Sequence, residues 1–220
     1  MTLPARIPIF PLPNAVLFPG ADLPLHVFEP RYRAMAADAL QGDRILGLVL
    51  LCPGWEATYF ETPEVHTVGC AGRMEDVVPL EDGRYVFRLH GLCRVEIVRW
   101  VSSEPYRVAE VRPTEERLPD EAEAASLRER DRILSAYTAL AAAATGRPAS
   151  ALTVDPEVPY PRLVNLACTH GGFSPEEKQR LLELLDVAER GRRVLGLLER
   201  RLEETLREAD GASEGPGALQ

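Results

Sequence analysis

The sequence predicts an α+β protein, in which a β-rich first part with one inserted helix is followed by a helical second part. Apolar residues recur with a period of about two up to Pro113 and with a period of about 3.6 after it. Turn signals such as Pro19-Gly20 and Asp82-Gly83 separate short apolar runs in the first part. We therefore expect a β-rich part at 1–113, a helical bundle at 114–209 and a disordered tail at 210–220.

The first part opens with a proline-spaced segment, Ile7 to Leu12. Because proline has no N–H to donate to a sheet ladder, this segment is predicted to form an edge strand or turns. Three elements are expected next: an alternating strand at Leu23 to Val27, a helix from Pro30 that Gly42 ends, and an almost wholly apolar strand, buried on both faces, at Ile45 to Leu51.

The remaining strands of this part follow a loop from Pro53 to Pro63. Gly69 and Gly72 predict a bulge or bend in the long segment from Val65 to Leu80. Three further strands are expected at Tyr85 to His90, Arg94 to Val101 and Tyr106 to Val111. Their spacing is typical of a small antiparallel barrel or sandwich.

Helix signals govern the second part. A capping box of Asp120 and Glu123 begins a helix that runs to Gly146, and a short helix is expected from Arg162 to His170. Ser174 and Glu177 form a second capping box, with Pro175 at the first helical position. The pattern recurs at Asp186 and Glu189, which predicts a break before the last helix.

Charge and composition argue against several classes of function. The chain has 25 basic and 34 acidic residues and a net charge of −9, so we expect no nucleic acid as partner. Glutamates are interspersed among the arginines of the last helix, which is typical of a solvated helix face; these arginines are Arg190, Arg192, Arg193, Arg200 and Arg201. No membrane-spanning run or secretory signal is visible, so we expect a cytoplasmic protein with no membrane partner.

The cysteines and histidines could suggest a metal site. The close spacings of His66 with Cys70 and of His90 with Cys93 are the reason to consider one. Both pairs fall on predicted strands, however, and His90 and Cys93 have opposite parity there and would point to opposite faces. The four cysteines form no C-x-x-C pair. We therefore expect reduced, structural cysteines, no metal and no cofactor.

Three charged or phenolic residues gather where the first helix is expected to begin. Glu29, Arg31 and Tyr32 could form a catalytic site or a site for a peptide terminus. The alternative is a structural ion pair with a core tyrosine, and the periodicity favours it because Tyr32 falls on the apolar face of the helix.

Aromatic residues in the loop after the third strand are a second candidate. Trp55, Tyr59 and Phe60 could anchor a bound partner, because apolar side chains on a polar loop expose surface that a partner would cover. The alternative is a lid that packs back on the core. We assign both groups to peptide binding and assign no catalytic residue, since no G-x-S-x-G elbow or local Cys-His signature occurs.

Six motifs recur in a known family of proteins: Ile7 to Pro13, Leu17 to Gly20, Pro24 to Tyr32, Gly91 to Val95, Glu177 to Glu183 and Glu189-Arg190. With these motifs the chain resembles the N-terminal substrate-binding domain of Lon proteases, and most of all the small bacterial proteins that consist of this domain alone. It implies a PUA-like pseudobarrel followed by a helical bundle. The G-x-x-x-x-G-K-[ST] loop and the Ser-Lys dyad of full Lon proteases are missing, so we expect no enzyme.

The resemblance implies a non-catalytic module that recognises exposed apolar or unfolded polypeptide segments. We expect binding in a groove where the two parts join, near Val111 to Leu118, by burial of apolar side chains or by addition of a strand. One alternative is a small hydrolase or nucleotide-modifying enzyme, in which His26 or His90 acts with Glu29. Another is an adaptor or regulator of a Lon-type protease.

Overall fold

The computed structural model describes residues 3–59, 61–119, 124–145, 155 and 157–213. The chain forms two compact units: unit 1 comprises Met1–Glu116 and Ser174–Leu185, and unit 2 comprises Arg117–Phe173 and Asp186–Gln220. The division thus differs from the one expected at residue 113, because a short segment of the expected helical part belongs to unit 1.

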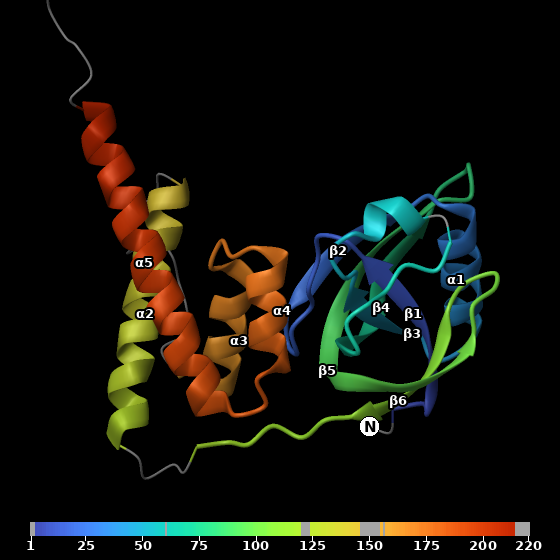
Figure 1. Ribbon diagram of the computed structural model, residues 1–220, viewed down its shortest axis with the longest axis horizontal. Coiled ribbons are helices and arrows are strands. Elements are labelled where there is room, and N and C mark those ends of the chain that lie inside the picture. Colours follow the sequence, from blue (N-terminus) through green and yellow to red (C-terminus); the bar gives the residue numbers. More distant parts are fainter. Residues whose placement is uncertain (1–2, 60, 120–123, 146–154, 156, 214–220) are drawn as a thin grey trace, which may run out of the picture. The chain divides into compact units, whose positions relative to one another are not determined.

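Unit 1 contains a sheet that closes on itself (Figure 1). Its strands are β1 (Arg6–Leu12), β2 (Asp22–Val27), β3 (Ile45–Leu50), β4 (Val68–Pro79), β5 (Tyr85–Ser102) and β6 (Val108–Pro113). The strand order is β2-β5-β4-β3-β1-β6, and β5 also pairs with β6, which closes the barrel and leaves β2 as an edge strand. Strands β1 and β3 are parallel, so the expected antiparallel barrel contains one parallel pair.

The expectation that β1 is an edge strand is wrong, because β1 lies between β3 and β6. Successive N–H groups of a strand point to opposite sides, and that of Ile9 donates to the carbonyl oxygen of Arg107 on the β6 side. The backbone nitrogen of Pro8 therefore faces β3, but the pairing of β1 with β3 begins only at Ile9. The backbone nitrogen of Pro11 faces the β6 side, but the pairing of β1 with β6 ends at Pro8. Staggered neighbours thus accommodate both prolines.

Strand β5 is continuous, although two strands were expected there. Its first half pairs with β2 and β4 and its second half pairs with β6. At Gly91, where the break was expected, the backbone exchanges hydrogen bonds of 2.8 Å with Gly20 and Ala21. A Cβ at position 91 would collide with the carbonyl oxygen of Phe18, so glycine allows this close approach. The bulge expected near Gly72 is confirmed between β4 and β5.

Apolar side chains from every part of the barrel fill its interior. Every residue of β3 is buried, as predicted, and helix α1 (Pro30–Gln41) buries Tyr32, Met35, Ala36 and Ala39. One cluster of the core comprises Ile7, Ile9, Ile45, Val49, Ala71, Val95, Ala109 and Val111. The barrel is thus a packed core, and only its surface and ends are available to a ligand.

Helix α4 (Pro175–Glu183) belongs to unit 1 and begins with the expected capping box. The backbone N–H of Glu177 donates to Ser174 Oγ at 3.2 Å, and the N–H of Ser174 donates to Glu177 Oε2 at 2.9 Å. Arg94, on β5, is buried and donates from Nε to the carbonyl oxygen of Leu182 at 2.9 Å. Its Nη1 lies 2.6 Å from Glu116 Oε1, so one guanidinium joins the barrel, the helix and residue 116.

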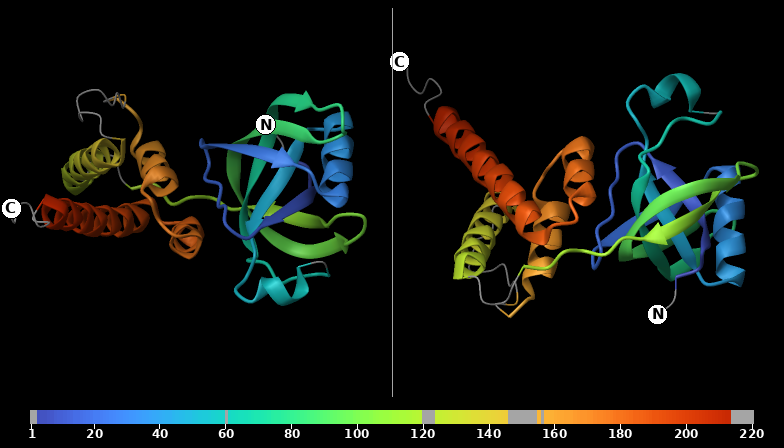
Figure 2. Two further views of the ribbon diagram at one scale, coloured as in Figure 1. Left: turned by 90° about the horizontal axis from the view of Figure 1, so that it is seen from above. Right: turned by 60° about the horizontal axis from the view of Figure 1, so that its bottom comes forward.

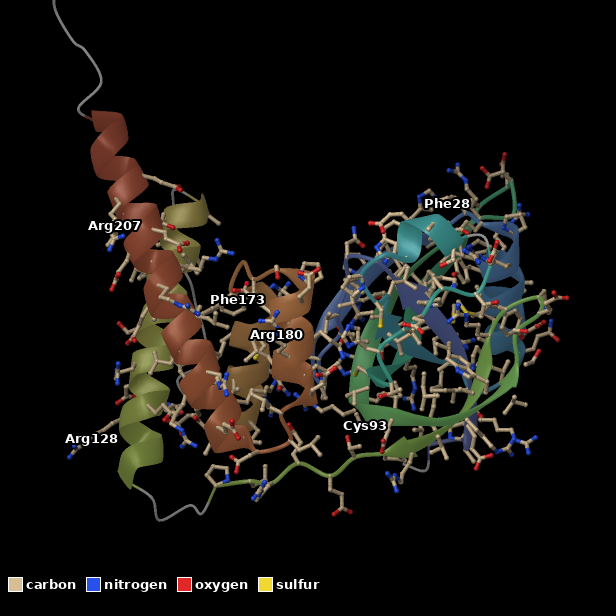
Figure 3. All side chains as sticks on the ribbon, in the orientation of Figure 1. Phe28, Cys93, Arg128, Phe173, Arg180 and Arg207 are labelled. Carbon is tan, nitrogen blue, oxygen red and sulfur yellow. The ribbon has the colours of Figure 1, made fainter. Side chains whose placement is uncertain are left out.

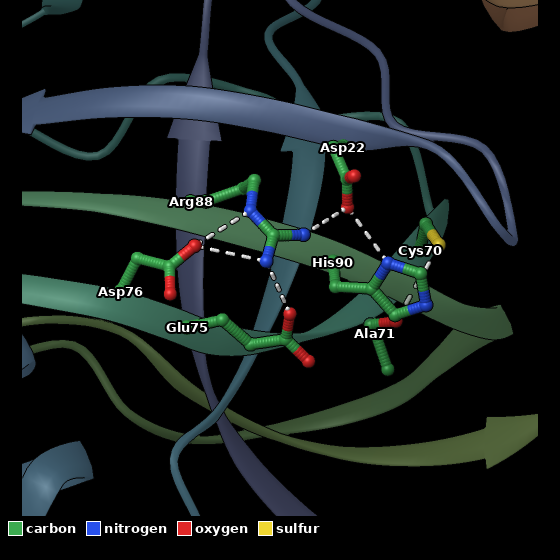
Figure 4. A network of polar contacts seen from close by, with 7 residues as sticks. All are labelled: Asp22, Cys70, Ala71, Glu75, Asp76, Arg88 and His90. Carbon is green, nitrogen blue, oxygen red and sulfur yellow. Dashed lines mark hydrogen bonds and ion pairs between the residues drawn. The ribbon is translucent and has the colours of Figure 1, made fainter.

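A network of ion pairs crosses three strands on the outer face of the barrel (Figure 4). Arg88 on β5 lies 2.9 Å from Asp22 on β2, and 2.8 Å from Glu75 and 2.9 Å from Asp76 on β4. His90 Nδ1 lies 2.7 Å from the same Asp22 oxygen. The network thus holds the edge strand β2 to the barrel.

The described residues of unit 2 form the helices α2 (Ala124–Thr145), α3 (Tyr160–His170) and α5 (Val187–Ser213). The break expected at Asp186 is confirmed, and Asp186 Oδ1 accepts a hydrogen bond of 2.9 Å from the N–H of Glu189. The capping box of Asp120 and Glu123 lies outside the described residues. Helix α5 continues to Ser213, beyond the start of the expected tail at residue 210.

The interpretation of the α5 arginines as a solvated face is wrong for Arg190, which is fully buried. Arg193 pairs with Glu189, Arg201 with Glu204 and Arg207 with Glu203, at 3.6, 3.4 and 3.3 Å on the exposed side, as expected. Within the described ranges, no helix has the length and apolar character needed to cross a membrane. The same residues contain no group of three or more His, Cys, Asp or Glu arranged for a metal ion.

Replacing Arg94 tests the link between α4 and the barrel. We expect Arg94→Met to lower the free energy of unfolding by about 3–5 kcal/mol, because it leaves buried polar partners without their donor. Urea denaturation followed by tryptophan fluorescence measures unit 1 selectively, since Trp55 and Trp100 both lie in it.

The matched control for this change is Arg112→Met. Arg112 forms an exposed ion pair of 2.6 Å with Glu96, and its side chain is 69% exposed. Such pairs contribute about 0–1 kcal/mol, so a loss at Arg94 no larger than the loss at Arg112 would contradict the role given to Arg94.

The Asp22 carboxylate predicts a pH dependence. Partial burial raises the pKa of Asp22, but hydrogen bonds from His90 and Arg88 outweigh it and hold the pKa below its ordinary value. Its stabilising contribution is therefore complete above the unfolded pKa of about 3.9 and is lost as the pH falls through the folded value. We expect Asp22→Asn to lower the urea midpoint at pH 5, with a difference from the wild type that narrows at pH 3.

The Arg88→Gln background provides the control for this prediction. With its arginine partner removed, Asp22→Asn is expected to lower the midpoint by less than it does in the wild type. An equal effect of Asp22→Asn at pH 5 and pH 3 would show that ion pairing is not its source.

Candidate functional site

Three segments meet at the end of the barrel where the parallel strands β1 and β3 finish. They are the start of α1, the loop from Leu51 to Thr67 and the connection between β5 and β6. The loop contains the short 3-10 helix η1 (Trp55–Thr58) and projects from the barrel in both views of Figure 2. All three belong to unit 1.

Polar contacts fasten this loop to the start of α1. The hydroxyl of Tyr59 donates to Glu29 Oε1 at 2.5 Å, and Arg31 Nε donates to Glu29 Oε2 at 3.1 Å. Arg31 also donates from both terminal nitrogens to the carbonyl oxygen of Tyr59 at 3.4 Å. Glu29 and Arg31 therefore hold the side chain and the backbone of the same loop residue.

Aromatic rings surround the Arg31 guanidinium. Its central carbon lies 4.6 Å from the ring centre of Tyr32 and 5.1 Å from that of Tyr59. The Trp55 ring packs edge-on against Tyr59, with 5.4 Å between the centroids. Burial raises the pKa of Tyr32 to about 12, and burial and the Glu29 hydrogen bond raise the pKa of Tyr59. Both phenols therefore keep their protons at neutral pH and can donate them.

The structure brings together most residues selected from the sequence. Glu29 and Arg31 form an ion pair of 3.0 Å, and Tyr32 is buried against Phe10, which agrees with the structural interpretation of both. Trp55 and Tyr59 are half-buried against each other. Phe60 lies outside the described residues. A binding role for this group stays a prediction.

Arg107, just before β6, is a site residue that the sequence did not reveal. Only 8% of its surface is exposed, yet the side-chain hydrogen bond described for it runs to a backbone group, from Nη2 to the carbonyl oxygen of Pro63 at 2.7 Å. Its guanidinium carbon lies 5.4 Å from the centre of the Trp100 ring. Burial of the guanidinium, together with repulsion from Arg31, lowers the pKa of Arg107.

Arg107 borders two hollows. A small cavity of about 30 Å³ is lined by Arg31, Tyr32, Tyr59, Glu61 and Tyr106, among others. A wider groove of about 600 Å³ is lined by Thr62, Pro63, Glu64, Val65, Thr67, Ile97, Trp100, Ser103 and Arg107. We refer to its apolar lining residues, Pro63, Val65, Ile97 and Trp100, as the apolar wall. Pro63, Ser103 and Arg107 line both, so the cavity and the groove adjoin.

The groove follows an unpaired edge of β5. Pairing between β4 and β5 reaches Val68 and Glu96, and the last bond on that side joins the N–H of Ile97 to the carbonyl oxygen of Thr67. The preceding residues turn to β3, where His66 donates to Leu50. In the described part of the chain, β5 from residue 98 to 102 therefore has a ladder partner only in β6.

The acid-base pairs of the enzymatic alternative do not form. His90 contacts Asp22, and the His26 ring lies 6.1 Å from that of Phe28, an exposed residue on the outer surface of unit 1 (Figure 3). Among the residues that the structure describes, neither histidine bonds to Glu29, whose carboxylate is held by Arg31 and Tyr59.

Trp100 and Arg107 escaped the sequence analysis for different reasons. The run from Ile97 to Val101 places apolar residues at consecutive positions, which breaks the period of a strand with one solvated face and could have drawn attention to Trp100. Bulges opposite β6, between Ile97 and Arg99 and again between Trp100 and Ser102, produce this departure. Arg107 had no local signal, because its burial depends on the loop that covers it.

Known proteins resemble the chain over most of its length. The "Lon protease" of Anaeromyxobacter dehalogenans and the "Lon protease 2" of Myxococcus xanthus are each 30% identical to it over 211 residues, which cover 91% of this chain and 24% of theirs. The chain therefore spans about a quarter of the length of these curated relatives.

Solved structures agree on the fold. The N-terminal domain of Mycobacterium avium complex Lon protease superposes with a TM-score of 0.64 at 19% identity, covering 88% of this chain and 98% of the other. The Lon N-terminal domain protein of Xanthomonas campestris gives 0.56 at 23% identity, covering 87% and 97%. The sequence profile of the "ATP-dependent protease La (LON) substrate-binding domain" matches residues 6–200, and the chain belongs to this family.

Proposed function

We propose that unit 1 is a non-catalytic recognition module of the cytoplasm that binds exposed apolar or unfolded polypeptide segments in the groove beside β5. The observation that carries the proposal is the unpaired β5 edge from residue 98 to 102, which runs along an apolar wall. An extended polypeptide can pair its backbone with such an edge whatever its sequence.

The groove offers the side-chain contacts that strand addition needs. Val65, Ile97 and Trp100 line it, and Trp100 is 44% exposed, so a bound chain would cover apolar surface that now faces water. Its volume of about 600 Å³ has room for a few side chains. Backbone pairing would supply affinity, and the apolar wall would favour apolar segments. Together these contacts suit unfolded chains of many sequences.

The residues selected from the sequence act in this proposal mainly by placing the loop. Glu29 and Arg31 hold Tyr59, and the loop that contains Tyr59 continues into Pro63 and Val65 at the groove. Tyr59 lines the cavity and the half-buried ring of Trp55 packs against it, and both are proposed to contact a longer bound segment at its end.

Association with a Lon-type protease is a second candidate. It is favoured by the length comparison, since the curated relatives carry the matching region within proteins about four times as long. Under this candidate, the chain would act as an adaptor or regulator, and a purified Lon-type protease would compete with the unfolded polypeptide for the groove.

Truncating Trp100 tests the groove. We expect Trp100→Ala to weaken binding of reduced, carbamidomethylated α-lactalbumin, a permanently unfolded protein, by at least about tenfold, or about 1.4 kcal/mol. Calorimetric titration of the full chain measures the affinity, and the urea midpoint verifies that the variant is folded.

Phe28→Ala is the matched control, because Phe28 is 61% exposed and lies outside the lining of the groove. Its affinity should equal that of the wild type. A short apolar peptide methylated on alternate backbone nitrogens should also bind more weakly than its unmethylated form, since strand addition uses those N–H groups. Unchanged affinity in folded Trp100→Ala would refute the groove as the binding site.

A further inference from the structure

We propose that the small cavity beside the groove is a carboxylate-binding site, in which Arg107 receives an acidic side chain or the C-terminal carboxylate of the bound polypeptide. The inference rests on the proposed function, because it names a chemical feature of the segment that the groove would hold.

The first argument is that the Arg107 charge is buried without a counter-ion. Among the described residues, no carboxylate lies within ion-pair distance of Arg107, and its side-chain hydrogen bond to Pro63 uses only Nη2. Arg94 in the same unit is also buried but has Glu116 at 2.6 Å. Because a buried guanidinium is costly unless it is paired, Arg107 is suited to an anion supplied from outside.

The second argument is the set of donors around the cavity. The Tyr32 hydroxyl and the Ser103 hydroxyl both belong to lining residues, and neither makes a hydrogen bond in the described part of the chain. The raised pKa of Tyr32 keeps its proton in place as a donor. The Tyr106 hydroxyl, in contrast, donates to Asp38 at 2.7 Å. Arg107, Tyr32 and Ser103 are thus the groups available to a carboxylate.

The third argument is size. A cavity of about 30 Å³ exceeds the ~10–15 Å³ that one water needs, yet it is far smaller than a pocket for a nucleotide. It has room for a group of a few atoms such as a carboxylate. Since Arg107 and Ser103 also line the groove, a chain in the groove can direct such a group into the cavity without leaving the apolar wall.

The balance of charge makes the site selective. The net charge of −9 disfavours acidic ligands over the chain as a whole, so attraction of a carboxylate depends on local guanidinium groups. Of the two arginines among the described lining residues of the cavity, Arg31 is paired with Glu29, whereas Arg107 has no carboxylate within ion-pair distance. Glu61 also lines the cavity and is exposed, so its carboxylate competes with that of a ligand.

The test uses the full wild-type chain and N-acetylated peptides of one apolar sequence, Ser-Leu-Phe-Val-Leu-Ala-Ala. One peptide ends in a free carboxylate, one in an amide, and a third ends in an amide but has Asp in place of Ser. Calorimetric titration should show that the first or the third binds at least about tenfold more tightly than the neutral amide. Which of the two does so separates recognition of a C-terminus from recognition of an acidic side chain.

Two variants locate the effect. Arg107→Gln keeps a donor for Pro63 but removes the charge, and it should reduce the ratio of the affinities for the charged and neutral peptides to about one. Glu61→Gln removes the competing carboxylate and should raise that ratio, which keeps the proposal testable if Arg107→Gln does not fold. Arg112→Gln, at an exposed arginine of β6, should leave the ratio as in the wild type.

The outcomes separate this inference from the proposed function. Equal binding of all three peptides by the wild type would overturn the carboxylate site and leave polypeptide recognition intact. Preference for a carboxylate that persists in folded Arg107→Gln would also overturn it. Failure of every peptide and of the unfolded protein to bind would refute the proposed function, and the carboxylate site with it.

Discussion

The buried guanidinium of Arg94 is the interaction on which the assembly of unit 1 depends. Arg94 extends from β5, and its guanidinium carbon lies 5.8 Å from the centre of the Phe18 ring. The guanidinium bonds to the carbonyl oxygen of Leu182 and to the carboxylate of Glu116. Leu182 lies on helix α4, whose segment Ser174–Leu185 returns to unit 1 after the segment Arg117–Phe173, which belongs to unit 2. A buried charge with these partners tolerates few alternatives, because any other position of α4 would remove the Leu182 carbonyl oxygen from the buried guanidinium. The specificity of this contact explains how a helix distant in sequence becomes part of the barrel.

Within the described residues, the barrel has two unpaired strand edges, the outer edge of β2 and the edge of β5 from residue 98 to 102, and they differ in how open they are to another chain. The outer edge of β2 contains Pro24, which has no N–H to offer, and the Arg88 network ties this strand inward. The β5 edge from residue 98 to 102 has no proline and contains the exposed residues Val98 and Trp100. Exposed apolar edges invite pairing with other chains, and proteins commonly block them. A barrel that blocks one edge and leaves another open is consistent with use of the open edge.

Much of the fold could be predicted from local patterns, whereas its long-range pairings could not. The period of the apolar residues located β2, β3 and α1, and the capping box at Ser174 located the start of α4. The interior position of β1 was missed because a proline prevents strand pairing only on the side that its nitrogen faces. Here β1 pairs with β6 in its first half and with β3 in its second half, so neither proline interrupts a hydrogen bond. Arg107 was missed because an isolated arginine is usually solvated, and here the loop at Pro63 and the Trp100 ring lie against its guanidinium. Sequence patterns report which groups are present, but their burial depends on segments far away in the chain.

Polar contacts help to hold the loop at the end of the barrel, and this matters for the proposed recognition. Glu29 and Arg31 fix Tyr59, Arg107 fixes Pro63, and the rings of Trp55 and Tyr59 pack on each other. A loop that buried these rings in the core would close the groove with its own side chains. Directional hydrogen bonds place the loop while leaving Val65 and Trp100 beside open space. Val65 and Ile97 also pack against the core, whereas Trp100 is 44% exposed, so Trp100 is the groove residue that can vary with little effect on the fold.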